Sequence, residues 1–520
     1  MRITFLGHAG FCVETSQAIV ITDPWLSPSG AFDSAWFQYP RNHHLAAYVQ
    51  DRLADARKER FVYLSHEHKD HFDPAFLQSL RCRDFTVVIA DFRRAYLKSA
   101  FAEYRCKGVV ACGDGEEVEI PGGRLKLYLD DSELNRDSAI LIEGDGSSFL
   151  DLNDCRIFDE VPAIAREEGP IDVFTCQFSG AGWHPTCYDY PRETYETISR
   201  KKTIAKFHSV AKGIRALAPR VFVPSAGPPC FLDPVLSRLN FEAVNIFPRS
   251  AKLLDFLRPR LKSVDTSLLE LMPGDVLDVD TCTLAYKTKD RVSEGTLEPY
   301  IRAYAASYEG FFLERQRLYQ DRDGSAGLLG RLQGALEEKL SALTLHDRVQ
   351  TPLYFCLDDA PDRMLRVDFP AKRVDFVSQI EDERQYSITA PSWEVARVLD
   401  EKITWDDFSL TFRMRLNREP DIHQTVLQGF LRLEPEDMNW FCSKLLNIES
   451  SQERIVVEAA GKRYAIDRYC PHQGGDLSQG WIEDGRFLTC ARHQWQFDLE
   501  REGEALKNEG SIHAVCLDDD

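Results

Sequence analysis

The sequence predicts a layered α/β fold in its first half, then an α+β module, then a small β domain. In the first half, short apolar strands such as 61–64 and 84–91 alternate with helix-like runs such as 43–57 and about 191–218. A helical stretch at 290–345 is followed by strand-like segments up to about 435, and a last β-rich unit begins near residue 448. We therefore expect three modules, at 1–290, 291–445 and 446–520.

In the first module, two segments form a hairpin that ends at Asp23, and paired strands and helices then follow in turn. The expected hairpin strands are 2–15 and 17–25, with helices near 74–80 and 92–104 and strands at 125–130, 138–146, 147–154, 171–180 and 220–229. In the middle module, 327–346 is an amphipathic helix and the strand-like segments are 352–358, 364–369, 373–378, 386–391, 408–416 and 427–434. The last module has strand-like runs at 454–470 and 486–499, separated by a glycine-rich turn.

Composition excludes several classes of protein. The 520 residues are 43% hydrophobic and 28% charged, which is typical of a globular chain, and the formal net charge is −20. A nucleic-acid binder that relies on electrostatics needs a basic face, so we expect no nucleic-acid partner. The apolar stretches are strand-sized, and the first 15 residues lack the features of a signal peptide, so we expect a cytoplasmic protein without a membrane segment. Fourteen cysteines are too scattered for a disulfide scaffold.

Near the C-terminus, two short motifs carry a four-ligand metal set. Cys470 and His472 form C-x-H, and after 17 residues Cys490 and His493 form C-x-x-H. Zinc could use two thiolates and two imidazoles. However, this pairing resembles the Rieske [2Fe–2S] family, in which the cysteines bind one iron and the histidines bind the other. The resemblance covers about 455–510 and includes Trp495.

A second ligand set follows the strand at 61–64. Residues 65–71 read Ser-His-Glu-His-Lys-Asp-His, which places His66, His68, Asp70 and His71 in an H-x-H-x-D-H motif. The motif resembles the metallo-β-lactamase superfamily over roughly residues 1–250. That resemblance implies an αββα sandwich, a pair of metal ions, Asp154 as the carboxylate shared between them, and Asp23 as outer support for the histidines.

The sequence departs from that superfamily where a further histidine is usual. The loop 130–137 contains no histidine, so we take Glu133 as the substitute ligand, with Asp130 and Asp131 as rivals. The usual last histidine, near 225–227, is also absent, and His184 either replaces it or lines the mouth of the site. These changes leave carboxylates in place of imidazoles, which suits iron and oxygen chemistry better than a zinc pair that activates water.

The two ligand sets together predict an oxygenase, because a Rieske cluster carries single electrons and hydrolyses nothing. The whole chain resembles the CMP-N-acetylneuraminate hydroxylases, through segments at 23–26, 65–71, 153–155, 217–227, 405–408 and 418–422. This resemblance implies a non-haem iron site, with two irons expected, that uses O2 to oxygenate a small polar, anionic substrate. No dinucleotide fingerprint is present, so electrons must come from an external ferredoxin, cytochrome b5 or flavin reductase. A homo-oligomer is expected by analogy with other Rieske oxygenases.

Two other functions remain open from sequence. One is a metal-dependent hydrolase, a lactonase or phosphodiesterase, whose Rieske domain senses redox state. The other is a non-catalytic electron-transfer or scaffold protein. Eight Lys and Arg against two Glu at 192–220 form either a solvated helix face or an attractive surface for an anion.

Overall fold

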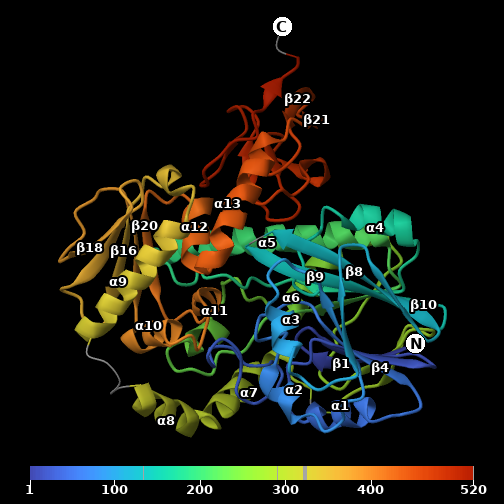
Figure 1. Ribbon diagram of the computed structural model, residues 1–520. Helices are drawn as coiled ribbons and strands as arrows, with labels where there is room; N and C mark the ends of the chain where they lie inside the picture. The colour runs from blue at the N-terminus through green and yellow to red at the C-terminus, as the bar shows by residue number, and fades with distance from the viewer. Residues whose placement is uncertain (133, 290, 320–324, 519–520) are drawn as a thin grey trace. The chain divides into compact units, whose positions relative to one another are not determined.

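The computed structural model describes residues 1–520 except 133, 290, 320–324 and 519–520 (Figure 1). The chain folds into two compact units. The first consists of Met1–Asp131, Asn135–Ala181 and Glu196–Tyr308. The second consists of Ser132–Leu134, Gly182–Tyr195 and Glu309–Asp520. The division into three modules stays a prediction.

The first unit is built on two large sheets. One has eight strands in the order β15-β14-β1-β2-β3-β4-β5-β6, and the other has seven in the order β13-β12-β11-β10-β9-β8-β7. The strands of the first sheet are β1 (Arg2–Gly7), β2 (Gly10–Glu14), β3 (Ala18–Thr22), β4 (Glu59–Leu64), β5 (Thr86–Ala90), β6 (Gly108–Cys112), β14 (Val276–Asp278) and β15 (Thr283–Tyr286). Those of the second are β7 (Glu117–Ile120), β8 (Gly123–Ser132), β9 (Asn135–Gly144), β10 (Ser147–Asp151), β11 (Val173–Gln177), β12 (Val221–Ser225) and β13 (Ser267–Leu268).

The two sheets pack face to face, with helices on both outer faces. One apolar cluster joins the inward side chains of both sheets, such as Phe11 on β2 and Phe149 on β10, whose rings lie 5.2 Å apart. A second cluster joins β3–β5 to α1 (Leu45–Leu53), α2 (Pro74–Ser79) and α3 (Tyr96–Phe101). A third joins β9–β12 to α4 (Val161–Glu168), α5 (Arg192–Leu217) and α6 (Ser250–Leu257). This confirms the αββα sandwich. The unit also contains α7 (Glu294–Ala306).

Strand direction decides which ends of the two sheets carry the site. Strands β3 to β6 are parallel, as are β10 to β13, and β1 runs in the direction of β3 because both are antiparallel to β2. The carboxyl ends of β1, β3 and β4 therefore lie at one edge of the first sheet. In the second sheet β9 is antiparallel to β10, so the amino end of β9 lies beside the carboxyl end of β10.

The second unit contains an α+β part and a small β part, as expected. Its five-stranded sheet has the order β18-β17-β16-β19-β20, with strands β16 (Leu353–Leu357), β17 (Met364–Asp368), β18 (Arg373–Val377), β19 (Gln385–Ala390) and β20 (Arg415–Glu419). Its helices are α8 (Glu309–Tyr319), α9 (Ser325–Ala342), α10 (Ser392–Leu399), α11 (Trp405–Leu410), α12 (Thr425–Arg432) and α13 (Pro435–Ser450).

The strand-like readings of 408–416 and 427–434 are wrong for most of their length. Residues 405–410 form α11, which begins with a capping box between Thr404 and Asp407. Residues 425–432 form α12, whose buried Leu427, Phe430 and Leu431 follow the helical i, i+3, i+4 spacing. A capping box at the start of α11 and the spacing of the apolar residues in α12 favour a helix, and the density of apolar residues alone does not reveal either signal.

The tail of the second unit has two small sheets. One has the order β21-β22-β27 and the other β23-β24-β25-β26. Their strands are β21 (Arg454–Ala459), β22 (Lys462–Asp467), β23 (Trp481–Glu483), β24 (Phe487–Thr489), β25 (Gln496–Asp498), β26 (Glu504–Ala505) and β27 (Val515–Cys516). No helix in the described part of the chain is long and apolar enough to cross a lipid bilayer.

Candidate metal centre and cluster site

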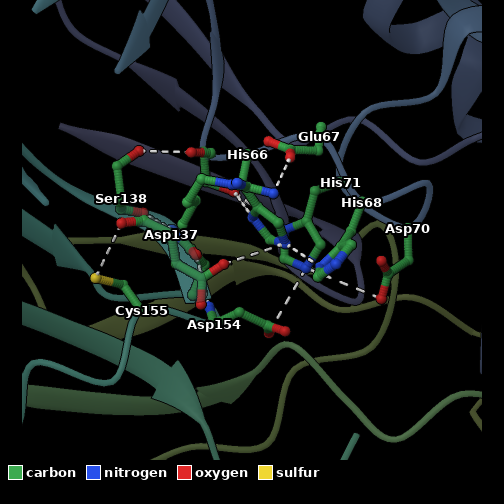
Figure 2. A network of polar contacts seen from close by, with 12 residues as sticks. His66, Glu67, His68, Asp70, His71, Asp137, Ser138, Asp154 and Cys155 are labelled. Atoms are coloured by element: carbon green, nitrogen blue, oxygen red, sulfur yellow. Dashed lines mark hydrogen bonds and ion pairs between the residues drawn. The ribbon is translucent and has the colours of Figure 1, made fainter. Parts of the chain in front are cut away.

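The predicted motif at 65–71 lies at the carboxyl end of β4, and its side chains converge with acids from the second sheet (Figure 2). Three overlapping groups of side chains bring their ligand atoms close enough to share metal ions. The groups are His66 with His68 and Asp137, His66 with His71 and Asp154, and His8 with Asp70 and His71. These groups include every residue that the sequence predicts for the motif and for the shared carboxylate, with the exception of Glu133: His66, His68, Asp70, His71 and Asp154.

Asp23 and Ser65 hold the histidines from behind. The Nδ1 atom of His71 lies 2.7 Å from the Asp23 carboxylate, which also accepts hydrogen bonds from the backbone N–H and the hydroxyl of Ser65. The same hydroxyl lies 2.9 Å from Nδ1 of His66. Because these contacts occupy the outer nitrogens, both rings turn their Nε2 atoms toward the other ligands. The Nε2 atom of His66 lies 2.8 Å from Nδ1 of His68, and that of His71 lies 3.6 Å from Oδ1 of Asp154.

Asp137, from the loop 130–137 that contains no histidine, completes the group with His66 and His68. Its Oδ1 lies 3.5 Å from Nε2 of His66, and it is buried. The next residue, Ser138, fixes its position, since the Ser138 hydroxyl donates to the Ser65 carbonyl and the Tyr63 hydroxyl donates to the Ser138 carbonyl. Glu133, our expected substitute, lies outside the described residues, and Asp130 and Asp131 belong to none of the three groups found among the described residues.

His8 was missed by the sequence analysis. It follows β1, and its Nε2 lies 3.0 Å from Oδ2 of Asp70. Its φ of 56° is uncommon for a residue other than glycine, and Asp23 (37°) and Asn153 (38°) share this left-handed conformation. Such backbone strain gathers at functional sites. The glycines on either side of the His8–Ala9 pair, which permit a tight turn, were the available signal.

The electrostatics of the cage suit a cation. Burial and the neighbouring Asp154 carboxylate raise the pKa of Asp137 to about 7. Against the effect of burial, the Asp70 carboxylate and its acidic neighbours raise the pKa of His71 well above its usual value. The His71 Nε2 and Asp154 Oδ1 atoms are buried and lie 3.6 Å apart, and neither makes a hydrogen bond within the described ranges of the chain. That spacing fits two ligands of one ion better than a hydrogen-bonded pair.

His184 belongs to the second unit. Its Nε2 lies 3.2 Å from the Tyr190 hydroxyl and 3.3 Å from Nη2 of Arg418, and its ring packs edge-on against Tyr188. It is in none of the three groups found among the described residues. A catalytic role for His184 stays a prediction.

The choice between Asp137 and Glu133 as the third ligand can be tested directly. We expect Asp137→Asn to lower the metal affinity of the cage by at least about tenfold, because an amide oxygen is a weaker ligand than a carboxylate. Metal content after dialysis against a graded series of chelator concentrations measures this. Glu133→Gln is the matched comparison. If Glu133→Gln loses the metal while Asp137→Asn keeps it, the assignment is reversed.

The C-terminal ligands lie in two loops of the tail. Cys470 and His472 follow β22, and Cys490 and His493 follow β24. Backbone hydrogen bonds close both loops, from Cys470 N–H to the Gly475 carbonyl and from Cys490 N–H to the Trp495 carbonyl. A Cβ atom at Gly475 would lie 3.0 Å from the Cys490 sulfur, so a larger residue here would push against this ligand atom, whereas glycine leaves room for it.

These four side chains fit a cluster with two sulfur and two nitrogen ligands. Both cysteines are fully buried, and burial together with the adjacent Cys490 thiol raises the pKa of Cys470 well above its usual value. The His472 and His493 rings lie 4.7 Å apart at 88°, with both Nδ1 atoms buried. Iron would supply the positive charge that keeps two adjacent buried thiolates ionised.

Aromatic rings from the same unit enclose His472. Trp495 stacks on it at a centroid distance of 4.4 Å, and His423 packs edge-on against both rings, at 5.5 Å from His472 and 5.3 Å from Trp495. His423 follows β20, outside the ligand motifs. Its backbone N–H donates to the Lys507 carbonyl, and its carbonyl accepts from the Glu509 N–H. The sequence analysis did not identify this residue.

Comparisons with known proteins find one domain match near each end of the chain. Residues 435–514 match the family described as Rieske [2Fe-2S] domain, and residues 2–131 match the β-lactamase superfamily domain. A protein of Mycolicibacterium smegmatis named as a Rieske 2Fe-2S iron-sulfur protein is 28% identical over 98% of each chain. The cytidine monophosphate-N-acetylneuraminic acid hydroxylase of Danio rerio is 22% identical over 81% of this chain and 70% of its own, and that of Cricetulus griseus is 24% identical over 84% and 76%.

Among solved structures, CmlA, a diiron β-hydroxylase from Streptomyces venezuelae, has a TM-score of 0.35 at 17% identity, covering 53% of each chain. An isothiocyanate hydrolase from gut bacteria of Delia radicum has a TM-score of 0.36 at 12% identity, covering 55% of this chain and all of its own. The chain thus joins a β-lactamase superfamily domain to a C-terminal Rieske [2Fe-2S] domain, and it is similar over most of its length to proteins named as Rieske iron-sulfur proteins and as CMP-N-acetylneuraminic acid hydroxylases.

Proposed function

We propose that this protein is an iron-dependent oxygenase that hydroxylates or otherwise oxygenates a small, polar, anionic metabolite with electrons received through its Rieske domain. One observation carries the proposal: a cage of histidines and carboxylates occurs in one chain with a set of two buried cysteines and two half-buried histidines. A Rieske cluster supplies single electrons, and non-haem iron supplies the reactivity toward dioxygen. The hydroxylase names of the relatives support this class, and the substrate of this chain is a further question.

Some residues of the cage would bind metal, and others orient the residues that do. His66, His68 and Asp137 would hold one iron, and Asp70, His71 and His8 the other, with Asp154 between them. Asp23 orients His71, and Ser65 orients His66, so both rings keep a fixed direction. Cys470, Cys490, His472 and His493 would hold the cluster, and Trp495 and His423 limit the movement of the His472 ring.

Metal analysis of anaerobically purified protein tests the proposal. We expect about four irons per chain, two in each site, together with oxygen uptake that requires an external reductant. The reductant, a ferredoxin, cytochrome b5 or flavin reductase, is supplied separately in the assay. Zinc in the cage, about two irons in total and reductant-independent hydrolysis would instead support a lactonase or phosphodiesterase with a redox-sensing domain.

A further inference from the structure

A single lysine of the basic run at 192–220 is buried beside the metal cage. Lys206 lies on α5 and is 7% exposed, whereas the other seven Lys and Arg of this run are exposed or half-buried. Its ammonium donates a hydrogen bond to Oε1 of Gln177, at the carboxyl end of β11. It forms no ion pair within the described part of the chain. An ammonium has three donors, so a neutral amide alone leaves this buried charge without a counter-ion.

Arg156 is a second cation on the same side of the cage in sequence, two residues after Asp154. It is half-buried, and its Nε atom is buried without a hydrogen-bond partner among the described residues. Burial and the Arg156 charge lower the pKa of Lys206 to about 7, while the Asp154 carboxylate acts in the opposite direction. Arg156 also acts on the carboxyl group of Asp137. The backbone also ties Lys206 to the cage, because the N–H of its partner Gln177 donates a hydrogen bond to the carbonyl of Asn153, the residue before Asp154.

The neighbouring strand end offers a further polar atom. Ser225 ends β12, and it is in register with Gln177 of the parallel strand β11. Ser225 is 1% exposed, and its buried hydroxyl makes no hydrogen bond with any residue that the structure describes. A buried hydroxyl and a buried ammonium at adjacent strand ends, both with spare hydrogen-bond donors, indicate a ligand that accepts hydrogen bonds.

We propose that Lys206 and Arg156 bind an oxyanion, a carboxylate or phosphate group of the substrate, next to the metal cage, and that Gln177 orients the Lys206 ammonium. The assignment of this anion to a substrate rests on the proposed function, whereas the anion site itself needs only the charges described above. An oxyanion supplies the counter-charge that the buried ammonium lacks, and charge-assisted hydrogen bonds to it are stronger than neutral ones. The binding of one charged group on this side would hold the rest of the substrate against the cage.

Isothermal titration calorimetry with the metal-loaded protein tests the inference, with inorganic phosphate and acetate as probes that separate the two oxyanion types. We expect Lys206→Met to weaken the binding of the preferred anion by at least about tenfold, as for the loss of a charge-assisted hydrogen bond. Lys201→Met is the matched control, because it removes the same charge from an exposed position of the same helix and should leave the affinity unchanged. Metal content and thermal unfolding of each variant verify that fold and cage are intact.

If Lys206→Met does not fold, Arg156→Gln, at a half-buried position, carries the same expectation of weaker anion binding. Wild-type binding of neither anion at millimolar concentration would overturn the inference, as would equal affinity in folded Lys206→Met and wild-type protein. Anion binding that depends on Lys206 in a protein whose cage holds zinc would support the anion site and contradict the oxygenase. Iron in the cage and oxygen uptake, together with anion binding that does not depend on Lys206, would support the oxygenase and contradict the anion site.

Discussion

Cys470→Ser is expected to abolish the [2Fe–2S] cluster and, with it, all oxygen-dependent product formation. Cys470 is fully buried next to the Cys490 sulfur, and serine replaces a thiolate ligand by a hydroxyl that stays protonated at neutral pH. The protein should lose about two irons per chain and the electron paramagnetic resonance signal of the reduced cluster, while the metal in the histidine cage remains.

Cys516→Ser is the matched control, because Cys516 lies in the same small sheets on β27 and outside both ligand loops. It should keep the cluster and the activity. Continued oxygen-dependent turnover in Cys470→Ser protein without a cluster would contradict the proposed role of the Rieske domain. Hydrolysis that survives the same substitution would support the hydrolase.

Asp154→Asn is expected to empty the cage and leave the cluster untouched. Asp154 faces Nε2 of His71 at 3.6 Å and completes a group with His66, so its carboxylate is the one best placed to serve both ions. The loss of an outer partner of a metal ligand already costs about tenfold to a hundredfold in affinity, so the loss of this ligand should cost at least that much. Metal content and the cluster absorbance, measured on the same sample, separate the two sites.

Asp145→Asn is the control for Asp154→Asn, since Asp145 is an exposed acid in the turn between β9 and β10 and hydrogen bonds only with Ser16 among the described residues. It should keep the full metal content of both sites. An Asp154→Asn protein that binds metal as tightly as the wild type would exclude Asp154 as a ligand.

Candidate ligands that are close in the chain could be predicted from their spacing, and Asp154 could be predicted from the superfamily resemblance, but His8 and Asp137, which the fold brings in from afar, could not. The motif at 65–71 and the two cysteine–histidine loops are local, so their spacing alone identifies them. His8 and Asp137 join the cage only because β1, across β2 from β3, runs in the same direction as β3, and because β9 is antiparallel to β10. Neither direction can be read from the residues themselves, because alternation gives the face of a strand and not its neighbour.

The fold class was predictable because its signal is also local in the sequence. Alternating strands and helices at 1–290 indicated a layered α/β fold, and the long helix expected at about 191–218 is α5. What the sequence could not separate was the buried Lys206 from the exposed lysines around it. Burial of one side chain depends on how α5 packs on β11 and β12, and a charge pattern carries no information on that.

The packing of His423 against His472 and Trp495 concerns protein engineers who shorten chains. A fragment that starts at residue 446 would retain all four predicted cluster ligands but lose His423, which packs against His472 and Trp495 in the intact protein. Water would then reach the edge of one imidazole that is shielded in the intact protein. The segment that contains all four cluster ligands is therefore shorter than the segment that also preserves their native surroundings.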